Sequence, residues 1–189
     1  VDDFLARNNG ELLAALGNFV NRTLTFAVRY FDGKVPAAGE RGEPDRQHVA
    51  TIASQAGKTG EHLEALRFKA ALNEVMALAR SANGYFDAKQ PWKQRKEDIG
   101  GCGTTINVCV QTVKALATLM GPFLPFSAAR CAAMLGLEGA DGAESRLAGL
   151  HEVLPWAGAT QELPGGHRLG EPAILFKKLD AAELFGEVG

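Results

Sequence analysis

Apolar side chains recur at helical spacing along the opening segment, residues 3–31. Intervals of three, four and seven residues place them on one face of a long amphipathic helix. That face consists of Leu5, Leu12, Leu16, Val20, Ala27 and Tyr30 or Phe31. We expect the helix to end near Asp32-Gly33, because glycine is a common stop, and residues 34–44 to form a loop rich in Pro and Gly.

The remaining chain shows the same period in shorter stretches. The pattern predicts helices over residues 45–56, 60–86, 104–120 and 125–135, with Gly57-Lys58-Thr59 as a turn between the first two of these. Pro91 directs Gln90 away from helical geometry and so separates the helix over 60–86 from the one over 104–120. The predicted fold is all-α: a bundle of about five helices with an irregular C-terminal tail. We divide the chain into a bundle (1–137), a loosely patterned connector (138–162) and a tail (163–189).

Composition narrows the class of protein. The chain has 189 residues, 46% of them hydrophobic, and a formal net charge of −2. This length suits one domain, and the charge excludes a polybasic protein while permitting a local nucleic-acid site. An odd number of cysteines without a Cys-x-x-Cys pair indicates reduced thiols and a cytoplasmic location. No apolar run approaches the roughly 20 residues of a membrane span. Because the chain starts at Val1 in helical pattern, we expect a piece of a longer polypeptide.

The sequence contains no complete catalytic or metal-binding motif among those we tested. Gly57-Lys58-Thr59 has Ile52 where a phosphate-binding loop needs its first glycine. The four histidines lack metal-binding spacing, and no serine occupies a Gly-x-Ser-x-Gly elbow. We therefore predict no catalytic residue and no metal ligand in this chain.

Two groups of residues suit RNA better. Asn18, Arg22 and Arg29 form a polar stripe on the first helix, and Trp92 follows Pro91 among the basic residues Lys89, Lys93, Arg95 and Lys96. A tryptophan can stack on an unpaired base, while nearby cations meet phosphates. Asn and Arg one helical turn apart can share the edge of one base. The plainer interpretation is a solvated face and a core tryptophan, as in a helical protein-interaction module.

Several ordered motifs resemble one family. They are LGNFVNR (16–22), RYFDGKVP (29–36), FKAALNEVMAL (68–78), NGYFD (83–87), QPWK (90–93), MGPFLPF (120–126) and LFKKLD (175–180). Their order and spacing resemble the anticodon-binding domain of methionyl-tRNA synthetase, a class I aminoacyl-tRNA synthetase. The resemblance covers residues 1–137 and 163–180, and only loosely 138–162.

The resemblance implies recognition of the CAU anticodon of methionine tRNA. The family's base-contacting positions fall on Asn18, Arg22, Pro91 and Trp92, and Arg29, Lys89, Lys93 and Lys96 are candidate phosphate contacts. It also implies that the tail packs on the bundle or on a catalytic domain. The catalytic signatures of the family are missing here, so this chain alone is not expected to be an enzyme or to hold a cofactor. ATP and methionine would bind the absent catalytic domain.

The expected partners are methionine tRNA and that catalytic domain, with no DNA and no membrane. A stand-alone RNA-binding relative, a protein-interaction module and a related synthetase specificity stay open. In a fragment, Ile174, Leu175 and Phe176 are expected to be exposed.

Overall fold

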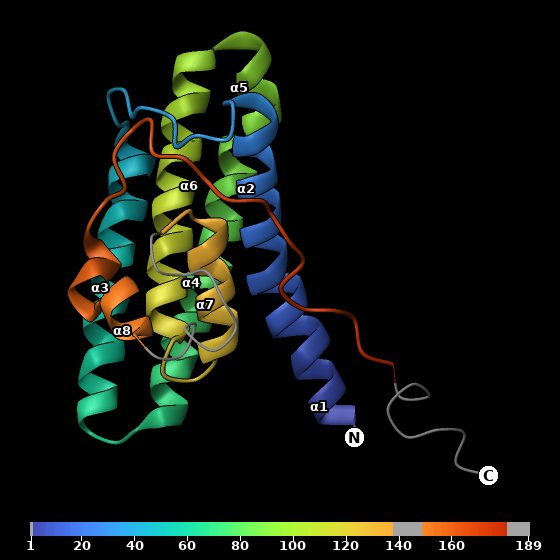
Figure 1. Ribbon diagram of the computed structural model, residues 1–189, viewed down its shortest axis with the longest axis vertical. Coiled ribbons are helices and arrows are strands. Elements are labelled where there is room, and N and C mark those ends of the chain that lie inside the picture. Colours follow the sequence, from blue (N-terminus) through green and yellow to red (C-terminus); the bar gives the residue numbers. More distant parts are fainter. Residues whose placement is uncertain (1, 138–148, 181–189) are drawn as a thin grey trace.

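The computed structural model describes residues 2–137 and 149–180, and these confirm the predicted all-α bundle (Figure 1). Long helices stand side by side, and the C-terminal segment runs back across them without regular structure. Within the described ranges the only strand-like pairing is an isolated antiparallel bridge between Lys34 and Arg168. The residues that the sequence analysis singled out are therefore positioned by helices.

The first helix is continuous but changes its winding. It consists of α1 (Asp2–Arg7), a π-helical stretch η1 (Asn8–Gly17) and α2 (Asn18–Tyr30). Its end is confirmed, because Asp32 and Gly33 follow with φ of 54° and 64°. The predicted inward face is buried from Leu16 to Ala27, whereas Leu5 and Leu12 before it, and Tyr30 and Phe31 after it, are only half-buried. For Leu5 and Leu12 the reason is visible in Figure 1, where α1 diverges from the bundle.

The boundary between the next two helices was predicted wrongly. Helix α3 spans Glu43–Glu64 and α4 spans Phe68–Lys89, so Gly57 and Gly60 lie inside α3 and not at a turn. The chain reverses at Leu66, whose φ is 57°. Glycine in a helix costs about 1 kcal/mol relative to alanine, and the packing of α3 against α4 and α6 outweighs that cost.

A short helix, α5 (Pro91–Glu97), was not predicted. It leads into α6 (Ile99–Met120), which starts earlier than expected because the Asp98 side chain caps it by accepting a hydrogen bond from the Gly101 amide at 2.9 Å. Helix α6 is the centre of the fold, with every residue from Cys102 to Met120 buried. Helix α7 (Pro125–Met134) packs against it. All three cysteines are buried and free.

Two short elements follow, the first packed against α7 and the second against α3 and α6. They are α8 (Leu150–Val153) and the 3₁₀ helix η2 (Trp156–Thr160). Lys114 of α6 donates to the carbonyls of Gly158 and Gln161 at 3.0 and 2.7 Å, which fixes η2. Burial lowers the pKa of this lysine. The connector's residues 138–148 lie outside the described residues.

The tail returns along the bundle towards the first helix (Figure 1). The His167 carbonyl accepts from the Val35 amide at 2.9 Å, and the Gly170 amide donates to the Met134 carbonyl at 3.0 Å. Further along, Arg130 donates to the Leu175 carbonyl at 3.1 Å. The expected exposure of residues 174–176 is right only for Ile174. Leu175 is buried, and Phe176 packs partly buried on the core, because the tail lies on the bundle itself.

Candidate nucleic-acid interface

Asn18 sits where the π-helical winding ends and α2 begins. The backbone N–H of Asn18 donates to the Leu13 carbonyl, and this hydrogen bond closes the last π-helical turn. Asn83 of α4 stabilises this junction, because its side-chain amide donates to the carbonyls of Ala15 and Ala79, both at 2.8 Å. π-helical turns are frequent at functional sites. The Asn18 side chain is left exposed, one turn before Arg22 on the same face.

Arg22 is held by α4 from three sides. Its Nη1 lies 3.0 Å from Asp87 Oδ1, and its Nη2 donates to the Asn83 carbonyl at 3.4 Å. The guanidinium carbon is 4.3 Å from the centroid of the Phe86 ring, a cation–π contact. Its Nε is buried and has no hydrogen-bond partner in the described chain. The guanidinium group is thus fixed in orientation, while 34% of the Arg22 side chain stays exposed.

Trp92 also lies next to the Phe86 ring. Gln90 adopts a left-handed conformation (φ 47°, ψ 59°), which turns the chain between α4 and α5, and Pro91 takes the first helical position. Pro91 is buried, and its carbonyl accepts from the Cys102 thiol at 3.4 Å. The Trp92 ring lies 6.1 Å from the Phe86 ring at 37°, yet 44% of the residue is exposed. Trp92 is therefore not a core plug.

Lys89 has a different surrounding from the other predicted phosphate contacts. Its Nζ lies 2.8 Å from Asp45 Oδ1, which also accepts from the Tyr85 hydroxyl at 2.7 Å. Burial alone would raise the pKa of Asp45, but the hydrogen bonds from Lys89, Tyr85 and the Gly42 amide outweigh it and hold that pKa low. Asp45 is 2% exposed. The Lys89 ammonium is therefore already paired with a carboxylate, unlike the other basic candidates, and its role as a phosphate contact stays a prediction.

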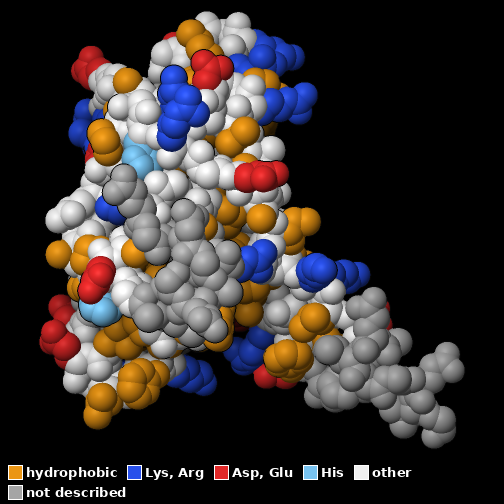
Figure 2. Space-filling view, in the orientation of Figure 1, with side chains coloured by type: hydrophobic (Ala, Val, Ile, Leu, Met, Phe, Trp, Pro, Cys, Tyr) orange, Lys and Arg blue, Asp and Glu red, His pale blue; other side chains and the backbone are white. Residues whose placement is uncertain are grey.

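The other basic candidates face solvent. Lys93 and Lys96 are exposed on α5, and Arg29 is exposed at the end of α2. Lys and Arg side chains gather at the upper end of the molecule in Figure 2, the end where α5 lies in Figure 1. Positive charge is therefore concentrated at this end of the bundle, although the composition of the whole chain is nearly neutral.

Sequence analysis missed the residues that join these groups. Phe86 is next to both Arg22 and Trp92, and Asp87 pairs with Arg22. Tyr30 was placed on the apolar face and Arg95 only among the basic residues near Trp92, so their contact, with ring centroid and guanidinium carbon 4.4 Å apart, was missed. A weak signal existed for Tyr30, which extends the four-residue spacing of Asn18 and Arg22 on the first helix. Contacts between α2, α4 and α5 depend on tertiary structure and leave no local pattern.

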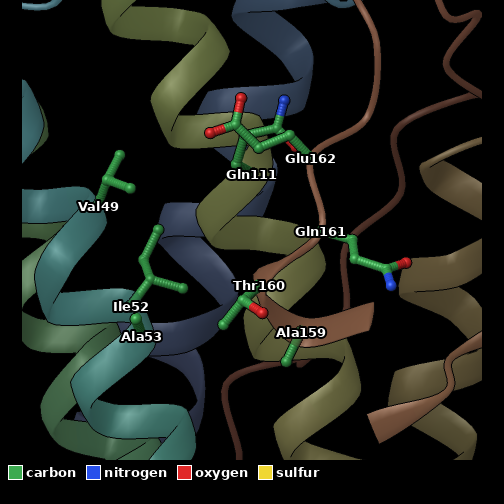
Figure 3. A pocket seen from close by; sticks show the side chains of 8 residues that line it. All are labelled: Val49, Ile52, Ala53, Gln111, Ala159, Thr160, Gln161 and Glu162. Atoms are coloured by element: carbon green, nitrogen blue, oxygen red, sulfur yellow. The ribbon is translucent and has the colours of Figure 1, made fainter. Parts of the chain in front are cut away.

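A small pocket elsewhere does not offer a rival site. It lies between α3, α6 and the end of η2 with the two residues that follow it (Figure 3), where Val49 and Ile52 face Gln111 and Ala159. Two of its polar side chains already have partners in the chain. The Gln111 side chain exchanges two hydrogen bonds with the Leu163 backbone, at 3.0 and 2.7 Å, and Glu162 lies 2.7 Å from Arg41.

Neither a metal site nor a membrane segment emerges from the described ranges. No group of His, Cys, Asp or Glu there could hold a metal ion. None of the described helices combines the length and apolar character that crossing a bilayer requires.

The surface formed by Arg22, Phe86 and Trp92 can bind a base non-covalently. An exposed aromatic face accepts a stacked base, and the fixed guanidinium and the free amide of Asn18 present donors and an acceptor beside it.

Comparison with known proteins agrees with this geometry. The family model described as the anticodon binding domain of methionyl tRNA ligase matches residues 35–185. Similar curated proteins include the methionine–tRNA ligase of Pyrococcus abyssi, 46% identical over 177 residues, covering 94% of this chain and 22% of that protein. The methionine–tRNA ligase of Bacteroides fragilis (strain YCH46) is 39% identical over 186 residues, covering 98% of this chain and 26% of the relative.

Solved structures give the same result. The apo form of Mycobacterium tuberculosis methionyl-tRNA synthetase superposes with a TM-score of 0.82 at 27% identity, covering 95% of this chain and 34% of that one. The chain thus spans about a quarter of the curated relatives, 22% and 26% of the two described. The helix with Asn18 and Arg22 precedes the range of the family model and is covered by these longer matches.

Proposed function

This chain belongs to the family of anticodon-binding domains of methionyl-tRNA ligase, and from that premise we propose that it binds the CAU anticodon of methionine tRNA through Asn18, Arg22 and Trp92. One observation carries the proposal. Arg22 and Trp92, from different helices, both lie next to the Phe86 ring, at 4.3 and 6.1 Å from its centroid, and both remain partly exposed. A purely structural Arg–Phe–Trp stack would be covered.

The proposed recognition assigns each residue a role. Trp92 stacks on the cytosine, and Pro91 fixes the direction from which the ring approaches. Arg22 donates to the acceptor atoms on the base-pairing edge, and the carbonyl of Asn18 accepts from the exocyclic amine. A different base leaves one of these groups unpaired, which costs about 1–3 kcal/mol by analogy with base readout in DNA.

In this proposal the chain works as part of a longer enzyme. The relatives are methionine–tRNA ligases about four times as long, since this chain spans 22–26% of them. We infer that ATP and methionine bind the parts that this chain does not span, and that anticodon binding here orients the tRNA for charging. The protein would act in the cytoplasm, where its buried thiols stay reduced.

The test is a titration of this chain with methionine tRNA and with the same tRNA carrying a changed anticodon, at low salt. Trp92→Ala should weaken binding to the first tRNA by roughly 5- to 150-fold, the loss of about 1–3 kcal/mol of stacking. The matched control is Trp156→Ala, because Trp156 is similarly exposed at 40% but lies on η2. It should bind like the unaltered chain.

Two results would contradict the proposal. Equal binding of both tRNAs would reduce the interaction to general electrostatics. Binding of neither tRNA by the unaltered chain would favour the alternative, a helical protein-interaction module in which Trp92 docks protein.

A further inference from the structure

Two arginines meet at one tyrosine ring next to the proposed base site. The guanidinium carbon of Arg95 lies 4.4 Å from the Tyr30 ring centroid, and that of Arg29 lies 5.3 Å from it. Within the described residues neither arginine forms an ion pair. Arg22, Arg41 and Arg46 each do, at 2.7–3.0 Å from a carboxylate. Two uncompensated positive charges at one ring repel each other and would be stabilised by an anion.

This cluster is continuous with the base site. The Tyr30 ring contacts the Phe26 ring edge-on at 4.6 Å, and Phe26 lies 6.5 Å from Phe86, which leads to Trp92. On α5, Arg95 follows Trp92 by three residues and so lies on the same helix face. Along α2 the surface from Asn18 to Tyr30 is roughly 18 Å long, at about 1.5 Å per residue. That length exceeds the site of a single base.

We propose that Arg95 and Arg29, held at the Tyr30 ring, bind a backbone phosphate of a nucleotide next to the one that stacks on Trp92. The inference rests on the proposed function and extends it to the RNA strand. A guanidinium is a planar fork that meets two phosphate oxygens at once. Packing on Tyr30 fixes the plane of that fork in advance, so less freedom is lost when the phosphate arrives. Arg95 is half-buried and can be oriented in this way.

The first experiment measures binding of a CAU anticodon stem-loop RNA to Arg95→Gln across a range of salt concentrations. We expect about a tenfold weaker complex near 0.1 M salt, as for a lost hydrogen bond to a charged group. The slope of log K against log salt should become shallower by about 0.7, the value for one phosphate of a single strand. Arg67→Gln is the matched control, since Arg67 is exposed in the turn between α3 and α4 at the far end of the bundle (Figure 1). Its affinity and slope should not change.

The second experiment identifies the phosphate. Stem-loops in which single loop phosphates are replaced by neutral methylphosphonates are bound to the unaltered chain and to Arg95→Gln. At one position, beside the base that Trp92 stacks on, the neutral linkage should weaken binding by the unaltered chain about tenfold and weaken binding by Arg95→Gln clearly less, since that variant keeps only Arg29 at the phosphate. Tyr30→Leu should weaken binding of the stem-loop less than Arg95→Gln does, because both arginine charges stay but lose the ring that fixes their orientation. Thermal unfolding of each variant separates loss of binding from loss of structure.

The outcomes distinguish this inference from the proposed function. If Trp92→Ala weakens binding but Arg95→Gln binds with unchanged affinity and slope, the phosphate site is wrong and the base site stands. The phosphate site is equally wrong if the Arg95→Gln effect is the same for every methylphosphonate RNA. If the unaltered chain does not bind the stem-loop at low salt, both proposals fall.

Discussion

His48 lies in a place where a protonated imidazole would be poorly accommodated. Its ring stacks on Tyr85 with centroids 4.5 Å apart, and its Nε2 is 3.2 Å from the Thr112 hydroxyl. That hydroxyl already donates its hydrogen to the Val108 carbonyl, so it accepts from a neutral histidine. Burial lowers the pKa of His48 to about 4, although Asp45 opposes the shift.

This histidine predicts acid sensitivity of the fold. Because the folded pKa lies below the ordinary value of 6.5, the unfolded chain binds protons more readily between the two values. Stability is therefore greatest above pH 6.5 and decreases as the pH falls towards 4, by about 3 kcal/mol at most from this residue, at about 1.4 kcal/mol per pKa unit. Urea unfolding at a series of pH values measures it.

The matched variant is His48→Gln, which removes the titrating group and keeps a donor for Thr112. Its stability should vary much less across that pH window than that of the unaltered chain, whatever its absolute value. Asp45 does not confuse the result, because its pKa is lowered from 3.8 and its contribution is lost at still lower pH. Parallel pH curves for the two proteins would show that His48 is not the cause.

At the scale of elements, hydrophobic periodicity determined the helices and tertiary contacts determined their ends. The long first helix, its stop at Asp32-Gly33 and the helix from Pro125 followed from spacing, glycine and proline. The turn at Leu66 did not, because a leucine with positive φ has no sequence signature and two glycines nearby indicated a turn instead. Helix α5 was hidden because seven residues are too few to show a period.

The tail depends on close backbone contact, and glycine makes it possible. A methyl group at Gly170 would overlap the Ala133 carbonyl at the end of α7, beside the hydrogen bond from Gly170 to Met134. We expect Gly170→Ala to lower the free energy of unfolding by about 1–3 kcal/mol, the usual cost of overpacking. Gly57→Ala is the contrasting variant, since it lies exposed within α3 with open space around it.

Gly57→Ala should raise the free energy of unfolding by about 0.5–1 kcal/mol, because alanine is the better helix former. Urea denaturation of both variants provides the comparison. A Gly170→Ala chain as stable as the unaltered one would mean that the tail does not press on α7 as described.

At the scale of the whole molecule, a nearly neutral chain concentrates cations and an aromatic surface at one end of the bundle. The net charge is −2, yet Arg22, Arg29, Lys93, Arg95 and Lys96 lie on α2 and α5 around Trp92. Sequence reasoning located Asn18, Arg22 and Trp92 because their residue types suit base recognition. It could not locate Phe86 or Tyr30, which look like ordinary core residues until α2, α4 and α5 are packed. For Lys89 the residue type suggested a phosphate contact, but its ion-pair partner Asp45 lies on another helix and could not be predicted from the sequence.

The central claim is that Trp92 stacks on a base of the anticodon, and fluorescence tests it most directly. The chain has two tryptophans, so Trp156→Phe leaves Trp92 as the only indole reporter. Addition of the CAU stem-loop should quench its emission in a saturable way, and a stem-loop with the cytosine replaced should do so only at much higher concentration. Binding of the CAU stem-loop without any change in Trp92 emission would contradict the account.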